Sequence, residues 1–162
     1  MTKAKPLPPV EVLREHFSYG PETGIVTRIK AGKTRPDMLG PVGSRVKSGH
    51  LHVKFNGKSL KLHRLAWKLQ TGVEAPDFID HRNRCPSDNR WKNLRAATRT
   101  QNGGNKIKYR GKWMAGVYPC GSKWLARGRA KWIGTYGTEQ DAHDAYVKWH
   151  RETYGEFSAY AV

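Results

Sequence analysis

The sequence predicts an α+β protein of two modules, a larger N-terminal one rich in short strands and a small C-terminal one. Apolar residues alternate between strand spacing and helix spacing over short segments, and Gly, Pro and Asn separate these segments. Six Trp and seven Tyr are enough for compact cores. After residue 105 the pattern changes to three short strands and one longer amphipathic helix. We therefore expect four regions: a flexible basic N-terminus at 1–9, a first domain at 10–105, a linker at 106–109 and a second domain at 110–162.

The first elements are a helix at 10–17, a strand at 24–29 and a basic loop at 30–41. Residues 51–62 alternate between apolar and polar side chains on both sides of Asn56-Gly57, a pair that favours a type I′ turn. This segment therefore predicts a β-hairpin. Apolar residues at helical spacing then predict a helix over 63–70 that ends before Gly72.

Two short strands and a short helix follow. The strands are expected at 78–81 and 94–97, with a polar loop between them. The sequence from Thr98 to Gln101 matches a capping box and starts a helix that carries Asn102.

The last third predicts strands at 113–118, 123–129 and 131–136, then a helix that Thr138 caps. This helix is amphipathic, so it should lie across one face of the three-stranded sheet. Arg127 and Arg129 are two residues apart on one predicted strand, which predicts that both point to the same face.

The composition favours a nucleic-acid partner. The 162 residues include 30 Lys and Arg against 13 Asp and Glu, a net charge of +17 that attracts polyanions. An unspecialised basic surface and a ribosomal-type RNA binder are the alternatives from charge alone. No run of 18 apolar residues, long basic amphipathic helix or apolar N-terminal segment occurs, so we expect no membrane partner and no signal peptide. The two cysteines are far apart, which argues against a disulfide framework and indicates a reducing cytoplasm.

One set of polar residues suggests metal-dependent hydrolysis. Asp80 and His81 are adjacent, and Asn93 and Asn102 follow in a stretch that is rich in Arg and poor in acid. In a nuclease with one metal ion, a carboxylate and an amide oxygen hold the cation, an imidazole takes a proton from water and a second amide orients the imidazole. Each residue alone has an ordinary explanation as a turn or surface residue.

Other polar and aromatic residues nearby have structural interpretations. Asp88 is expected to brace the loop with Arg90 or Arg95, and His63 to be a core or strand-end histidine rather than a metal ligand. Two tryptophans, Trp67 and Trp91, are expected to pack.

The first module resembles the HNH endonucleases of phage and mobile introns, which share the ββα-metal fold. The resemblance is carried by His63-Arg64-Leu65-Ala66-Trp67, Ile79-Asp80-His81, Asp88-Asn89-Arg90-Trp91-Lys92-Asn93-Leu94-Arg95, Ala97-Thr98 and Gln101-Asn102. It also includes Pro21-Glu22-Thr23-Gly24 in the region that precedes the nuclease core. A Gly-Asn pair that is usual in the loop is replaced by Arg84-Cys85.

The resemblance implies a role at four positions. Asp80 and Asn102 would bind one divalent cation, Mg²⁺ or Mn²⁺. His81 would be the general base, and Asn93 would orient its ring. It also implies double-stranded DNA as substrate and the cytoplasm of a bacterial or phage-infected cell, with no small-molecule cofactor. A monomer with one such site is expected to nick.

The second module resembles the AP2 DNA-binding domain. The matching residues are Gly116-Val117-Tyr118, Lys123-Trp124-Leu125-Ala126-Arg127, Trp132-Ile133-Gly134-Thr135-Tyr136, Thr138-Glu139-Gln140-Asp141-Ala142, Ala145-Tyr146 and Tyr154-Gly155-Glu156-Phe157. The family reads the major groove with the exposed face of its sheet. By position, the resemblance implies base contacts from Tyr118, Arg127, Arg129 and Trp132, and phosphate contacts from Lys123 and Lys131. An Arg that often precedes the first Gly-Val is Ala115 here, so the target sequence of the family does not transfer.

The expected protein is thus a free-standing, metal-dependent homing endonuclease of the HNH type with an AP2-like reader. The alternative is a non-catalytic regulator that binds specific DNA sequences on the same scaffold. An RNA-binding protein is a third interpretation, although no RRM or KH signature occurs.

Overall fold

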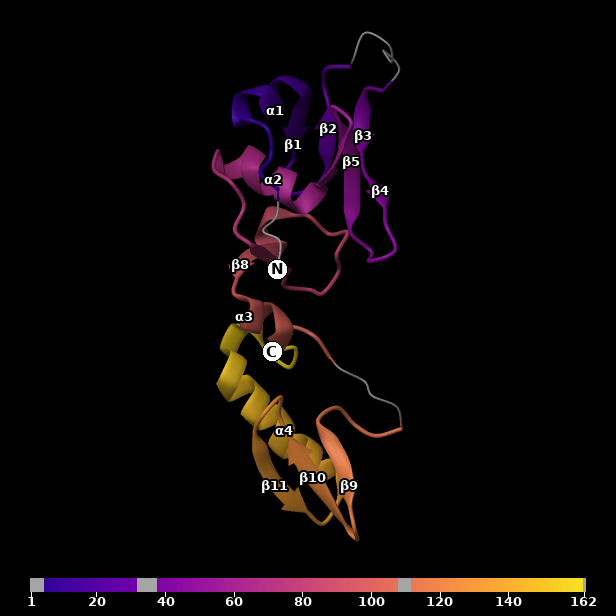
Figure 1. Cartoon of the computed structure of the whole chain (residues 1–162), viewed down its shortest axis with the longest axis vertical. Coiled ribbons are helices and arrows are strands. Elements are labelled where there is room, and N and C mark those ends of the chain that lie inside the picture. The colour runs from indigo at the N-terminus through magenta and orange to yellow at the C-terminus, as the bar shows by residue number, and fades with distance from the viewer. Residues whose placement is uncertain (1–4, 32–37, 108–111, 162) are drawn as a thin grey trace. The chain divides into compact units, whose positions relative to one another are not determined.

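The computed structural model describes residues 5–31, 38–107 and 112–161 (Figure 1). Contacts between residues divide the chain into two compact units, Met1–Thr98 and Arg99–Val162. This division falls earlier than the predicted end of the first domain at residue 105, because helix α3 (Arg99–Gly104) packs on C-terminal elements. Residues 1–4 of the predicted N-terminal segment and 108–109 of the predicted linker lie outside the described residues.

The first unit begins with helix α1 (Val10–His16), and two three-stranded antiparallel sheets follow. The first sheet has the order β1-β2-β3, with strands Phe17–Tyr19, Val26–Arg28 and Gly40–Val42. The second has the order β4-β5-β6, with strands Ser44–Arg45, Leu51–Phe55 and Lys58–Lys61. The end of the predicted basic loop therefore forms strand β3, and Pro41 is tolerated there because β3 is an edge strand.

The predicted hairpin is confirmed. Strands β5 and β6 pair, and both turn residues have positive φ, 47° at Asn56 and 71° at Gly57, as a type I′ turn requires. Helix α2 (Leu62–Thr71) follows and ends at Gly72, which has φ 79° in the left-handed region. The core of this unit lies where α2 meets α1, β1, β5 and β6. Its fully buried side chains include Leu13, Phe17, Val26, Leu62 and Leu65.

Strands β7 (Phe78–His81) and β8 (Leu94–Ala97) have the predicted bounds and form an antiparallel pair. The register places Asp80 opposite Arg95 and His81 opposite Leu94. A single 3-10 turn, η1 (Trp91–Asn93), leads into β8. Trp67 and Trp91 pack against each other with ring centroids 5.0 Å apart, as expected for packing residues.

The second unit contains α3, a sheet in the order β11-β10-β9, helix α4 (Glu139–Tyr154) and a final 3-10 turn, η2 (Gly155–Phe157). The strands are Val117–Cys120, Lys123–Arg127 and Trp132–Tyr136. Helix α4 lies against the sheet, as predicted (Figure 1). Thr138 caps this helix by accepting a hydrogen bond from the backbone N–H of Asp141 at 3.1 Å.

Two expectations for this sheet are wrong. The first strand begins at Val117 rather than at residue 113, because Gly116 has φ 78° and interrupts extended backbone. Strand β10 ends at Arg127, because a bulge follows Ala126 and the backbone N–H of Gly128 bonds to Lys131 in a turn. Arg129 therefore lies in that turn, and strand alternation does not align it with Arg127.

No helix among residues 5–31, 38–107 and 112–161 is long and apolar enough to cross a bilayer.

Candidate active site

The end of strand β7 holds Asp80 and His81, which are 4% and 6% exposed. Asp80 forms an ion pair with Arg95 on the neighbouring strand. Both Nε and Nη2 of Arg95 lie 2.8 Å from Oδ2 of Asp80. This partner was missed in the sequence, although pairing the two predicted strands in antiparallel register would have placed Arg95 opposite Asp80. The buried carboxylate is therefore held in one orientation by a charge-assisted contact.

Asn89 contacts the His81 ring. Nε2 of His81 lies 3.3 Å from the amide oxygen of Asn89. Burial lowers the pKa of His81 below its usual value, although the Asn89 hydrogen bond and Asp80 oppose that shift. His81 is thus neutral at neutral pH, the state that a general base requires.

Three histidine rings meet around this position. The ring centroids of His50, His63 and His81 are 5.1 to 5.7 Å apart. His63 lies at the start of α2 and is 7% exposed, which agrees with its interpretation as a core histidine. Its buried Nδ1 has no hydrogen-bond partner. Burial, followed by the neighbouring His81 and His50, lowers the pKa of His63 to about 2. His50, whose pKa burial also lowers, was not predicted, because only the fold brings it here.

His63→Gln should make stability less dependent on pH. The unfolded chain protonates His63 below about pH 6.5, whereas the folded chain keeps it neutral to about pH 2. Stability contributed by neutral His63 is therefore complete above pH 6.5 and falls with pH, by about 2 kcal/mol at pH 5. Urea unfolding at pH 7.5 and 5.0 should show a smaller loss for His63→Gln than for the wild type. His52→Gln on β5, a matched change, should alter the loss much less. Equal losses in all three proteins would contradict the buried neutral state.

Asn93 organises the loop between β7 and β8. Its side-chain amide donates to the carbonyl of Asp88 at 2.7 Å, and its amide oxygen accepts from the backbone N–H of Asn83 at 2.9 Å. The Asp88 carboxylate accepts hydrogen bonds from Arg90, which hold the pKa of Asp88 at about 2. Asp88 therefore braces the loop with Arg90, one of the two predicted partners. The Asn93 side chain thus bonds to the backbone of the loop, whereas the Asn89 side chain contacts the His81 ring.

The Arg84-Cys85 pair, which replaces the usual Gly-Asn pair, has an unusual backbone conformation. Arg84 has φ 61°, in the left-handed region that favours glycine. A non-glycine residue there costs about 1 kcal/mol. The loop therefore keeps a glycine-like conformation although the glycine is missing.

The N-terminal sheet supports the segment that carries Asn89. The Tyr19 hydroxyl donates to the carbonyl of Asn89 at 2.7 Å, and the N–H of Trp91 donates to Pro21 at 2.8 Å. Gly24 has φ 73°, and a Cβ there would lie 2.5 Å from the backbone nitrogen of Arg90. The segment Pro21-Glu22-Thr23-Gly24 is thus in close contact with the loop between β7 and β8.

The four predicted residues fall in different parts of the chain. Asp80, His81 and Asn93 belong to the first unit, whereas Asn102 lies half-buried on α3 of the second. Within the described ranges, no group of three or more His, Cys, Asp or Glu side chains could hold a metal ion.

The predicted DNA-contact residues are exposed on the second unit. They are Tyr118, Lys123, Arg127, Arg129, Lys131 and Trp132. Trp132 is 64% exposed and lies opposite Arg127 in the sheet register. In the described part of the chain, none of the four cations in this set has an ion pair. Their charges are therefore available to phosphates.

Residues 60–103 match the family model described as HNH endonuclease. The matched segment runs from the end of β6 through α2, β7 and β8 into α3, so it includes Asp80, His81, Asn93 and Asn102. It supports a nuclease, and DNA as its substrate. No curated protein and no solved structure matches the chain.

Proposed function

We propose that the protein is a divalent-metal-dependent endonuclease that cleaves phosphodiester bonds in double-stranded DNA. The observation that carries this proposal is the buried Asp80-His81 pair at the end of β7, inside the segment that matches the HNH endonuclease family. The net charge of +17 supplies the attraction for DNA.

In this reaction the imidazole of His81 takes a proton from a water molecule. The water oxygen forms a bond to phosphorus, and the bond from phosphorus to the 3′-oxygen breaks. Asn89 contacts Nε2 of the ring and so helps to hold the ring in place. Asn93 keeps the loop that carries Asn89 in place. Both asparagines therefore act by positioning, and His81 by moving the proton.

Asp80 and Asn102 are the residues that would hold Mg²⁺ or Mn²⁺. When bound, such a cation stabilises negative charge on the phosphate and on the leaving oxygen. Two protein oxygens are a sparse set, and Arg95 offsets part of the charge of Asp80. The cation is therefore expected to need phosphate oxygens from DNA for tight binding.

The metal requirement tests this proposal. EDTA should stop cleavage of a labelled duplex, and added Mg²⁺ should restore it, while circular dichroism shows no unfolding in EDTA. Calorimetry should show weaker Mg²⁺ binding to the free protein than to the complex of His81→Ala with DNA. Cleavage that persists in EDTA, or zinc that survives dialysis at one ion per chain, would contradict this account.

We further propose that the enzyme is of the free-standing phage homing type and that a monomer nicks one strand. One Asp80-His81 pair is present per chain, and one general base serves one strand at a time. The resemblance of the second module to AP2 domains supports a reader attached to the nuclease.

Arg127→Ala should weaken binding to the cognate duplex by about 1–3 kcal/mol if the side chain pairs with a guanine edge. Lys148→Ala, an exposed cation on α4, should weaken binding less and equally on all sequences. Gel-shift titrations on cognate and scrambled duplexes measure both. A loss for Arg127→Ala that is the same on every sequence would assign this residue to phosphate.

One observation favours the alternative function, a non-catalytic DNA-binding regulator. Arg95 neutralises Asp80 and occupies one of its oxygens. A regulator would bind DNA with the same affinity with or without Mg²⁺ and leave it intact.

A further inference from the structure

A cavity of about 410 Å³ lies within the second unit, and neither the nuclease site nor the sheet face explains it. Helix α4, strand β9 and the turn after β10 line it. The aromatic rings in its lining include Trp113, Tyr118, Tyr146, Trp149 and Tyr154. A volume of this size is typical of a site for a small ligand or for one unit of a polymer.

Three of the aromatic rings that line the cavity pack against glycines. A Cβ on Gly116 would overlap the ring of Tyr146, and a Cβ on Gly128 would overlap Trp149. A Cβ on Gly104 would lie 2.5 Å from Tyr154. Each of these three rings therefore lies directly against the backbone of a glycine.

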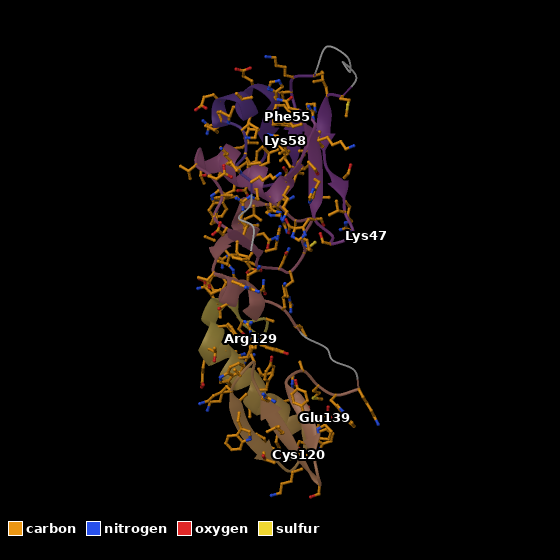
Figure 2. The ribbon with its side chains drawn as sticks, in the orientation of Figure 1. Lys47, Phe55, Lys58, Cys120, Arg129 and Glu139 are labelled. Carbon is orange, nitrogen blue, oxygen red and sulfur yellow. The ribbon has the colours of Figure 1, made fainter. Side chains whose placement is uncertain are left out.

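The charges around the cavity all have one sign. Its lining contains Lys106, Arg127 and Arg129 and no carboxylate. Within the described residues these three side chains have no ion pair. Arg129 lies in the turn that borders the cavity, beside α4 (Figure 2). A ligand with an aromatic face and an anionic group fits both features.

We propose that this cavity binds one unpaired nucleotide of DNA. The base stacks on the tryptophan and tyrosine rings, and the phosphate pairs with the cations, as in sites for single-stranded nucleic acid. Tyr118 and Arg127 line the cavity and are also exposed at the surface, so a base unstacked from DNA bound there can reach the cavity. The proposal shares with the proposed function only the identity of the ligand, DNA.

Binding of short single strands to the full chain in EDTA tests this proposal. The probes are a labelled thymidine hexamer and an abasic hexamer of the same charge. Fluorescence anisotropy should show about fivefold or tighter binding of the hexamer that has bases, because stacking contributes about 1–3 kcal/mol per base. His81→Ala should bind both probes like the wild type, so loss of nuclease activity does not alter this result.

Two matched charge reversals test whether the single strand binds in the cavity. Lys106→Glu changes an exposed residue that lines the cavity, and Lys148→Glu changes an exposed residue of α4 that does not. The first should weaken binding of the thymidine hexamer by about tenfold, and the second by less than about threefold. Equal binding of the two hexamers, or equal weakening by the two variants, would overturn the proposal.

Discussion

His81→Ala is expected to lower the rate of DNA cleavage by about 100-fold or more while DNA binding persists. The substitution removes the imidazole that accepts a proton from water and leaves the basic surface that binds phosphates. His81 is 6% exposed and contacts His50 and His63, so circular dichroism should first establish that the variant is folded. Single-turnover cleavage of a labelled duplex and anisotropy on the same duplex measure rate and affinity.

The matched control is His52→Ala, which removes a histidine of β5 that is not one of the three rings in the cluster around His81. It should cleave at the wild-type rate. If His81→Ala cuts like the wild type at neutral pH without added imidazole, His81 is not the base.

Arg95→Leu should lower the free energy of unfolding by about 3–5 kcal/mol, the largest effect on stability that we expect. The substitution leaves the Asp80 carboxylate, which is 4% exposed, without its guanidinium partner. Removing one partner of a buried ion pair destabilises a protein far more than replacing both partners. Urea unfolding at pH 7.5 in EDTA gives the change without a contribution from divalent ions.

Two controls separate the ion pair from simple loss of packing. The double variant Asp80→Asn with Arg95→Leu should regain much of the lost stability, because no carboxylate remains that needs the Arg95 guanidinium. Arg90→Leu removes a more exposed partner of Asp88 and should lower stability far less. If Arg95→Leu costs less than 1 kcal/mol, the pair with Asp80 does not stabilise the first unit.

Local sequence signals predicted much of the first unit. Asn56-Gly57 determines its turn by itself, and Gly72 ends α2 through its own backbone conformation. Strands β7 and β8 have the predicted bounds, because short apolar runs between turn residues define them. In each case the signal lies within a few residues of the structure that it determines.

The features that were missed depend on residues far apart in the sequence. Arg95 meets Asp80 through the strand register. Asn89 reaches His81 because Tyr19 and Gly24 contact the loop segment that carries it. His50 joins His63 and His81 only in the folded unit. A bulge that the sequence does not signal ends β10 before Arg129. The sequence thus names candidate residues for the proposed chemistry, but not the residues that the structure places against them.

Conversion of supercoiled plasmid DNA tests the central claim, hydrolysis of DNA, most directly. With Mg²⁺, the purified chain should produce open circles that DNA ligase reseals, because breaking the bond to the 3′-oxygen leaves a 3′-hydroxyl and a 5′-phosphate. EDTA should prevent the conversion. Plasmid that remains supercoiled in Mg²⁺, while gel retardation shows that the protein binds it, would contradict the nuclease and leave the DNA-binding regulator as the function.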